Sequence, residues 1–132
     1  MSYRKKIIAP LALLALLGCA GYGSSETSGS TSKAPAVKVV GDAQSCIPIV
    51  QIRSSTVHDD YTIDFEVGSR TYRSTLPHRC SGLGSEDAFT YETSLTQLCD
   101  TDIIYVLRNV GGSLERGAGC GLGKFVPVER IK

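Results

Sequence analysis

The chain has 132 residues, which is enough for one small domain and too few for two. It carries 14 lysines and arginines against 13 aspartates and glutamates, so its net charge near +1 lacks the strongly basic signature of a nucleic-acid-binding protein, and we expect no nucleic-acid partner. Hydrophobic residues make up 42% of the chain and aromatic residues only 7%, which predicts a globular protein with a thin core.

The N-terminus has the pattern of an export signal. Three basic residues, Arg4, Lys5 and Lys6, precede an apolar run from Ile7 to Leu17. A helix of eleven residues rises about 16 Å, whereas the hydrocarbon core of a membrane is about 30 Å thick. We therefore expect no permanent membrane span here, and we expect residues 1–18 to be removed on export as a signal peptide.

The end of this segment, Leu16-Leu17-Gly18-Cys19, resembles the lipobox of bacterial lipoproteins. In that family a diacylglyceryl group is attached to the cysteine thiol and the signal is cleaved just before it, which implies that Cys19 is lipidated. Two or three acyl chains anchor a protein durably. Ala20 follows in place of the aspartate associated with inner-membrane retention, which implies the periplasmic face of the outer membrane. The alternative is an ordinary secretory signal in which Cys19 has no role.

Residues 19–36 follow as the lipidated cysteine and a tether rich in glycine, serine and threonine. Such a tether spans about 20–25 Å as a flexible coil and leads to a domain at residues 37–132. Without the three basic residues of the signal, 11 basic residues remain against 13 acidic ones, so the mature net charge is −2. A mildly acidic domain is not attracted to an anionic membrane, so the lipid alone would hold it there.

Four cysteines remain in the predicted domain: Cys46, Cys80, Cys99 and Cys120. An even number in a small exported domain predicts two disulfides, and three pairings are open. We prefer Cys80–Cys99 with Cys46–Cys120, because the second bridge would tie the two ends of the domain. The separations of 34, 19 and 21 residues lack the close pairs of a zinc site, so we expect no metal.

In chain order, the first predicted strand covers residues 47–54, and the clearest elements follow it. Residues 61–67 alternate apolar and polar side chains, which is typical of a half-buried strand. Gly68-Ser69 suits a two-residue type II′ turn, and residues 70–76 return as the partner strand. This turn fixes a register in which paired residue numbers add up to 137.

Weaker strands are predicted at residues 88–95, 102–108 and 125–131, with Pro127 favouring an edge position for the last. Residues 77–86 and 109–123 are expected to be loops, and residues 94–99 are the only candidate for a helical turn. The sequence therefore predicts a mainly β fold, a small antiparallel β-barrel or sandwich of five to six strands braced by two disulfides.

Several short patterns resemble catalytic or ligand sites but have simpler explanations. His58-Asp59-Asp60 contains an acid–base combination, yet neighbouring residues of an extended chain point apart, so we expect a polar turn. His78 lies near Cys80, but an even cysteine count leaves no free thiolate for it to activate. We therefore expect no catalytic residue, no cofactor and no enzymatic activity.

One group of residues is a candidate for binding a small anionic ligand. Arginines are suited to carboxylate and phosphate groups, and the candidates around the first hairpin are Arg53, Arg70, Arg73 and Arg79. The alternative is that these side chains form local ion pairs with Asp64 and Glu66.

The chain from Cys46 to Val128 resembles an uncharacterised family, a domain of unknown function, of small proteobacterial lipoproteins with four extracytoplasmic cysteines. The motifs that carry the resemblance are Cys46-Ile47, Asp59-Asp60-x-Thr62-Ile63-x-Phe65, Leu76-Pro77-x-x-Cys80, Leu98-Cys99-x-x-Asp102-Ile103 and Cys120-x-Leu122-Gly123-x-Phe125-x-Pro127. We expect a non-enzymatic structural or interaction module with a cell-envelope protein as partner. The alternatives are a periplasmic module for a small anionic ligand, or a periplasmic inhibitor that presents a loop such as Ala118 to Lys124.

Overall fold

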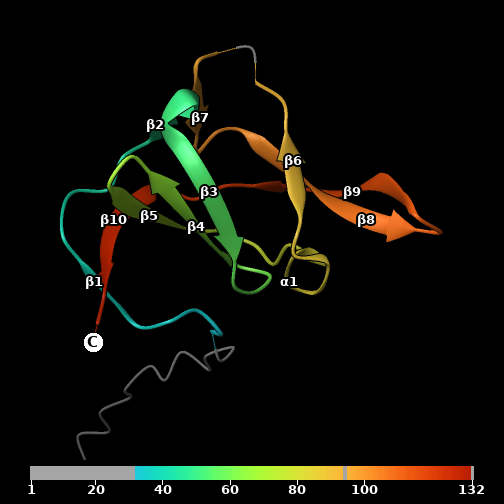
Figure 1. Ribbon diagram of the computed structural model, residues 1–132, viewed down its shortest axis with the longest axis horizontal. Helices are drawn as coiled ribbons and strands as arrows, with labels where there is room; N and C mark the ends of the chain where they lie inside the picture. Colours follow the sequence, from blue (N-terminus) through green and yellow to red (C-terminus); the bar gives the residue numbers. More distant parts are fainter. Residues whose placement is uncertain (1–31, 94, 132) are drawn as a thin grey trace, which may run out of the picture.

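The computed structural model describes residues 32–93 and 95–131. The predicted signal peptide (residues 1–18), the predicted lipidation site Cys19 and the first part of the predicted tether lie outside the described residues. The described part is mainly β, with antiparallel sheets, as the sequence predicted (Figure 1). None of its helices is long and apolar enough to span a bilayer.

The largest sheet has five antiparallel strands. In spatial order they are β1 (Val37–Val39), β10 (Phe125–Arg130), β5 (Arg70–Thr75), β4 (Thr62–Val67) and β3 (Ile52–Val57). The pairing of β1 with β10 joins the two ends of the described chain, since Val37 lies opposite Arg130.

The hairpin of β4 and β5 confirms the predicted register. Phe65 lies opposite Tyr72 and Ile63 opposite Ser74, as the sum of 137 requires. Gly68 has a φ of 61°, which the first central position of a type II′ turn demands and which glycine adopts without strain. Alternation and turn chemistry specify the same pairing here, so one register is favoured.

The remaining strands form two smaller sheets. One contains β6 (Phe89–Tyr91), β8 (Ile103–Val110) and β9 (Ser113–Gly121) in that order, and the other pairs β2 (Cys46–Pro48) with β7 (Gln97–Cys99). A 3-10 turn, η1 (Ile49–Gln51), follows β2, and the short helix α1 (Leu83–Glu86) lies between β5 and β6.

Several predictions about secondary structure were wrong. Residues 109–123, expected as a loop, form the end of β8 and all of β9, joined by a turn in which Gly111 and Gly112 have φ values of 60° and 88°. The alternating glycines of β9 carry no hydrophobic pattern, so the strand was not recognised. The helical turn expected at residues 94–99 is replaced by β7, and the only α-helix of the described residues, α1, lies in the expected loop 77–86. The last strand, β10, is not at an edge despite Pro127, because β1 pairs with it on one side and β5 on the other. The described chain has ten strands where five to six were predicted.

Two disulfides are present, but the preferred pairing was wrong. Cys46 is bonded to Cys99 and Cys80 to Cys120. The first bridge follows from the strands, because Cys46 lies directly opposite Cys99 in the β2–β7 pair. The expected reason for joining Cys46 to Cys120 also fails, because strand pairing between β1 and β10, not a disulfide, ties the ends of the domain.

The core lies between the five-stranded sheet and the three-stranded sheet. Phe65 is at its centre, with its ring 5.6 Å from that of Phe125 and 6.1 Å from that of Phe89, both edge to face. Ile104 from β8 and Ile47 from β2 are fully buried in the same cluster. This packing occupies one face of β4 and β5 and leaves the opposite face, here called the outer face, for polar side chains.

Candidate functional site

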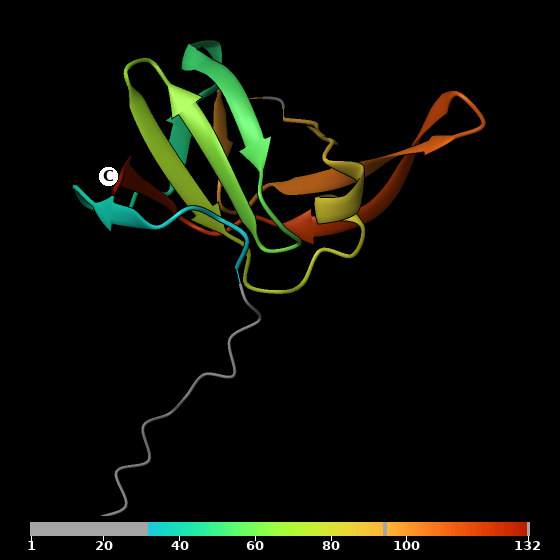
Figure 2. The same ribbon diagram turned by 60° about the horizontal axis from the view of Figure 1, so that its bottom comes forward.

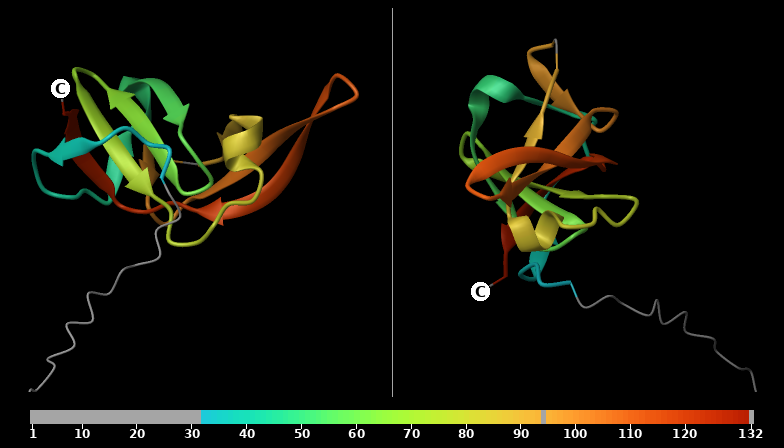
Figure 3. Two further views of the ribbon diagram at one scale, coloured as in Figure 1. Left: turned by 90° about the horizontal axis from the view of Figure 1, so that it is seen from below. Right: turned by 90° about the vertical axis from the view of Figure 1, so that its right-hand side faces the viewer.

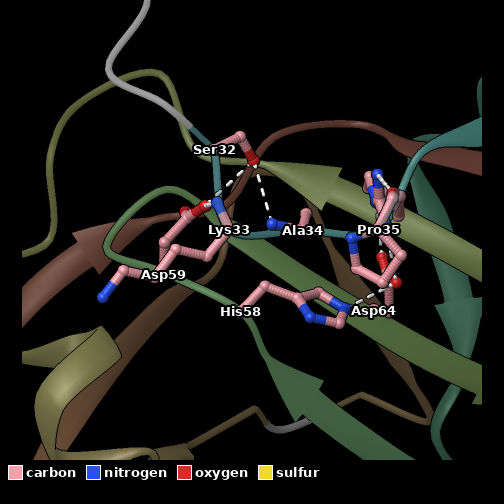
Figure 4. Close-up of polar contacts among 8 residues, drawn as sticks. Ser32, Lys33, Ala34, Pro35, His58, Asp59 and Asp64 are labelled. Carbon is pink, nitrogen blue, oxygen red and sulfur yellow. Dashed lines mark hydrogen bonds and ion pairs between the residues drawn. The ribbon is translucent and has the colours of Figure 1, made fainter.

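A segment at the start of the described chain runs across the outer face of the five-stranded sheet. Residues 32–36, here called the N-terminal strap, cross β4 and β5 before the chain enters β1 (Figures 2 and 4). The Ser32 hydroxyl and the Lys33 amide donate hydrogen bonds of 3.0 and 3.1 Å to Asp59 Oδ2. The Pro35 carbonyl accepts a hydrogen bond of 3.0 Å from Arg73 Nη1. These contacts attach the strap to the folded domain.

Beneath the strap lie Asp64 and His58 (Figure 4), which form a polar cluster with Arg73. Arg73 Nε and Nη2 donate to the two carboxylate oxygens of Asp64 at 2.7 and 3.0 Å. His58 Nε2 lies 2.8 Å from Asp64 Oδ2, and because a carboxylate only accepts, this nitrogen donates. The three side chains are only 10–14% exposed. The cluster is therefore a largely buried ion pair with a third hydrogen-bonded member.

The cluster keeps the Asp64 carboxyl ionised. Burial acts to raise the pKa of Asp64, but the hydrogen bonds from Arg73 and His58 and the charge of the guanidinium outweigh it and hold this pKa below its ordinary value. Both oxygens of Asp64 are occupied by donors. This carboxylate is therefore committed to the structure and is poorly placed to accept a proton from a substrate.

The two aspartates that follow His58 have separate roles. Burial acts to raise the pKa of Asp59, but hydrogen bonds from the Tyr61 amide and from the strap hold it below its ordinary value. The Gly84 amide, together with the Arg79 guanidinium, holds the pKa of Asp60 below its ordinary value. The expectation of a polar turn is supported, and His58 reaches across to Asp64 instead of pairing with its sequence neighbours.

The other chemical patterns of the sequence do not form a reactive group. Cys80 is buried in its disulfide, so His78 has no thiolate to activate. Asp102 accepts a hydrogen bond of 2.7 Å from the Cys99 amide at the entrance to β8, a turn contact. Within residues 32–93 and 95–131, no group of three or more histidine, cysteine, aspartate or glutamate side chains is arranged to hold a metal ion.

The four predicted arginines are distributed over separate contacts. Arg73 binds Asp64, Arg79 binds Asp60 at 2.9 Å, and Arg53 donates to the Gly68 carbonyl at 3.4 Å. Arg70 alone of the four lines a groove without an ion-pair partner in the described part of the chain. For Arg73 the alternative of a local ion pair with Asp64 is confirmed, and the set does not form one cationic site.

A groove of about 550 Å³ lies on the outer face of the five-stranded sheet. We call it the outer-face groove, and the residues lining it include Val37, Asp64, Glu66, Arg70, Val128 and Arg130. Its size is within the range of small-molecule sites. The sequence analysis did not identify Arg130 and Val128. Both are on β10, which pairs with β5 although the two strands are about 50 residues apart in the chain.

The second conspicuous feature is the hairpin of β8 and β9, which projects from the body of the molecule at the end opposite β1 (Figures 1 and 3). At its tip Val110 and Leu114 are 46% and 68% exposed. Arg116 stabilises the arm on one side, with its guanidinium 4.5 Å from the centre of the Tyr105 ring and 2.6 Å from Glu92. β9 is the edge of its sheet, so one side of its backbone has no strand partner in the described part of the chain.

Comparison with known proteins gives no match: no family model fits the chain, and neither a curated protein nor a solved structure is similar to it. The resemblance to small proteobacterial lipoproteins stays a prediction.

Proposed function

We propose that this protein is a lipoprotein of the bacterial cell envelope, anchored through Cys19 to the periplasmic face of the outer membrane, and that it acts as a non-enzymatic interaction module. The lipobox-like sequence supports the anchor. The two disulfides support an oxidising compartment outside the cytoplasm. The mature charge of −2 supports attachment by lipid in place of surface charge.

The projecting β8–β9 hairpin is the observation that carries the interaction role. In the described part of the chain, its strand β9 (Ser113–Gly121) has no partner along its outer edge, and its tip is apolar at Leu114. An exposed edge strand is a template for an added strand from another chain. We infer that an envelope protein adds an extended segment to β9 and covers the tip.

The architecture supports an interaction role for the projecting hairpin. We infer that the five-stranded and three-stranded sheets form a sandwich, because Phe65 of the first packs on Phe89 of the second. In such an arrangement the core fixes the base of β8 while its far end is free to project. The distal part of the arm can then contact a partner without disturbing the core.

The two alternatives have less support. An anionic-ligand module based on the four arginines is weakened because Arg73 and Arg79 are neutralised by carboxylates. An inhibitor loop at residues 118–124 is weakened because Cys120 is tied to Cys80 and Leu122 is buried. The exposed segment lies at residues 110–114 instead.

The anchor is tested by membrane fractionation. Cys19→Ser removes the thiol that would carry the lipid, so the variant should move from the membrane fraction to the soluble periplasmic fraction. Cys19→Ser material that stays with outer membranes would contradict lipid anchoring.

The interaction role is tested by photo-crosslinking from the hairpin tip. A crosslinking amino acid at Leu114 should capture one reproducible partner, whereas the same group at Val50, which is 87% exposed at a different part of the surface, should not. The purified partner should then bind at least about fivefold more weakly to Leu114→Asp, since loss of a buried leucine contact is worth more than 1 kcal/mol, and equally well to Val50→Asp. Equal capture at both sites, or no effect of Leu114→Asp, would refute the assignment.

A further inference from the structure

The outer-face groove combines opposite charges with an apolar floor. Glu66 on β4, Thr71 on β5 and Val128 on β10 lie in one row across the sheet, because Thr71 is opposite both of the others. Arg130 lies two residues beyond Val128 on β10, so its side chain is on the same face. The groove therefore has a carboxylate towards one side and a guanidinium towards the other.

The charges that line the groove balance one another. Asp64 is already neutralised by Arg73. The charges that remain on this face are the carboxylate of Glu66 and the guanidinium of Arg130, and neither has an ion-pair partner among residues 32–93 and 95–131. A purely anionic ligand would meet the like charge of Glu66 and a purely cationic ligand that of Arg130, whereas a ligand carrying both signs would satisfy both residues.

The spacing of the charges sets the length of such a ligand. Glu66 and Arg130 are two strands and two residues apart, which places their Cα atoms about 12 Å apart. Their side chains shorten this gap to roughly the length of two or three extended residues, at about 3.5 Å each. Val128, which lies in the row between them, and Val37, opposite Arg130 on β1, provide apolar contacts for small side chains.

We propose that the outer-face groove binds a short peptide with free termini, its ammonium group at Glu66 and its carboxylate at Arg130. The volume of about 550 Å³ accommodates a tripeptide with small side chains. This site is separate from the β8–β9 hairpin, so binding here is independent of the interaction role proposed above.

The test uses the full-length chain in a non-ionic detergent and trialanine as the probe, measured by isothermal titration calorimetry up to 10 mM. We expect a dissociation constant on the order of 1 mM or below. N-acetyl-trialanine and trialanine amide should each bind about threefold to fivefold more weakly, since each has lost one exposed ion pair. No heat with trialanine, or equal binding of the capped peptides, would overturn the proposal.

Two variants assign the ends. The Glu66→Gln variant should bind trialanine as weakly as the natural chain binds the N-acetyl peptide, and acetylation should then have no further effect on its affinity. The Arg130→Gln variant should behave in the same way towards the peptide amide. Glu115→Gln, on exposed β9, is the matched control and should leave binding unchanged. Independent effects of Glu66→Gln and the acetyl cap would refute the orientation, and weakening by Glu115→Gln would refute the location.

Discussion

Replacing Asp64 with asparagine tests whether the cluster beneath the strap holds the sheet together. The change keeps the shape of the side chain but removes the charge that Arg73 and His58 contact at 2.7–3.0 Å. The Arg73 guanidinium, only 14% exposed, would then be left without its counter-ion. Removing one partner of a buried pair destabilises by about 3–5 kcal/mol.

Because the cluster keeps 10–14% exposure, the expected loss is at the lower end of this range, about 3 kcal/mol. For a domain of this size that corresponds to a fall in Tm of roughly 12–24 °C. Urea unfolding followed by tyrosine fluorescence, with the disulfides intact, measures the free energy of unfolding. Glu66→Gln is the control, because Glu66 lies on the same strand and face but is exposed, and it should change stability by less than about 0.5 kcal/mol.

A double variant separates the ion pair from general damage to the strand. Asp64→Leu combined with Arg73→Met removes both charges, so it should be about 2 kcal/mol more stable than Asp64→Leu alone. If Asp64→Asn unfolds within 0.5 kcal/mol of the natural chain, or if the double variant simply adds two losses, the cluster does not stabilise the sheet.

Three other predictions follow from the fold. Replacing both Cys80 and Cys120 with alanine should lower the free energy of unfolding by about 4 kcal/mol, because the bridge closes a loop of 40 residues. A non-reduced peptide map of the natural chain should recover these two cysteines in one linked pair, and recovery in any other pair would contradict the structure. The pKa of Asp64 is lower in the folded chain than in the unfolded chain, so the Asp64 carboxylate stabilises the fold fully above about pH 4, and this contribution is lost as pH falls through the folded value. The free energy of unfolding, measured as a function of pH, should therefore decline below about pH 4, and the decline should be smaller in Asp64→Asn. Gly123→Ala should destabilise the fold by more than about 1 kcal/mol in thermal melts, since the added methyl group would overlap the Thr75 carbonyl oxygen. Gly121→Ala, with open space around it, should cost far less.

The hairpin of β4 and β5 was predictable because local rules agree there. Alternation set the inward residues, and the Gly68-Ser69 turn fixed the register, so the pairing of Asp64 with Arg73 was already contained in the sum of 137. The burial of that pair was not predictable, because it depends on the strap. A segment rich in small and polar residues looks like a tether whether or not it contacts a sheet.

The arm of β8 and β9 was missed for a related reason. Hydrophobic alternation detects a strand only where one face meets the core, and the distal half of this hairpin meets solvent on both faces. Gly117, Gly119 and Gly121 were therefore assigned to a loop. The remaining local signal in the sequence is the pair Gly111-Gly112, since a Gly-Gly pair favours a two-residue hairpin turn and both residues have positive φ values in the structure.

The disulfide pairing could not be derived because it depends on which strands are neighbours. Joining Cys46 to Cys120 assumed that a covalent bridge was needed to close the domain, whereas three residue pairs of β1 and β10 already bring the ends together through backbone hydrogen bonds. The bridges instead lie where strand pairing is short or absent. Cys46–Cys99 reinforces a pair of strands only three residues long, and Cys80–Cys120 attaches the loop after β5 to the base of the projecting arm.

The strap raises the contribution that the Asp64–Arg73 ion pair makes to the stability of the sheet beneath it. An ion pair on an open sheet surface contributes about 0–1 kcal/mol, because water screens it and both side chains stay mobile. With Pro35 placed over Arg73, the same pair is largely desolvated and its integrity becomes a condition for stability. The strap therefore divides the outer face into a part that stabilises, around Asp64, and a part that is left open for a ligand, around Glu66 and Arg130. Because Asp64 and Arg73 neutralise each other beneath the strap, the open part is left with the opposite charges of Glu66 and Arg130.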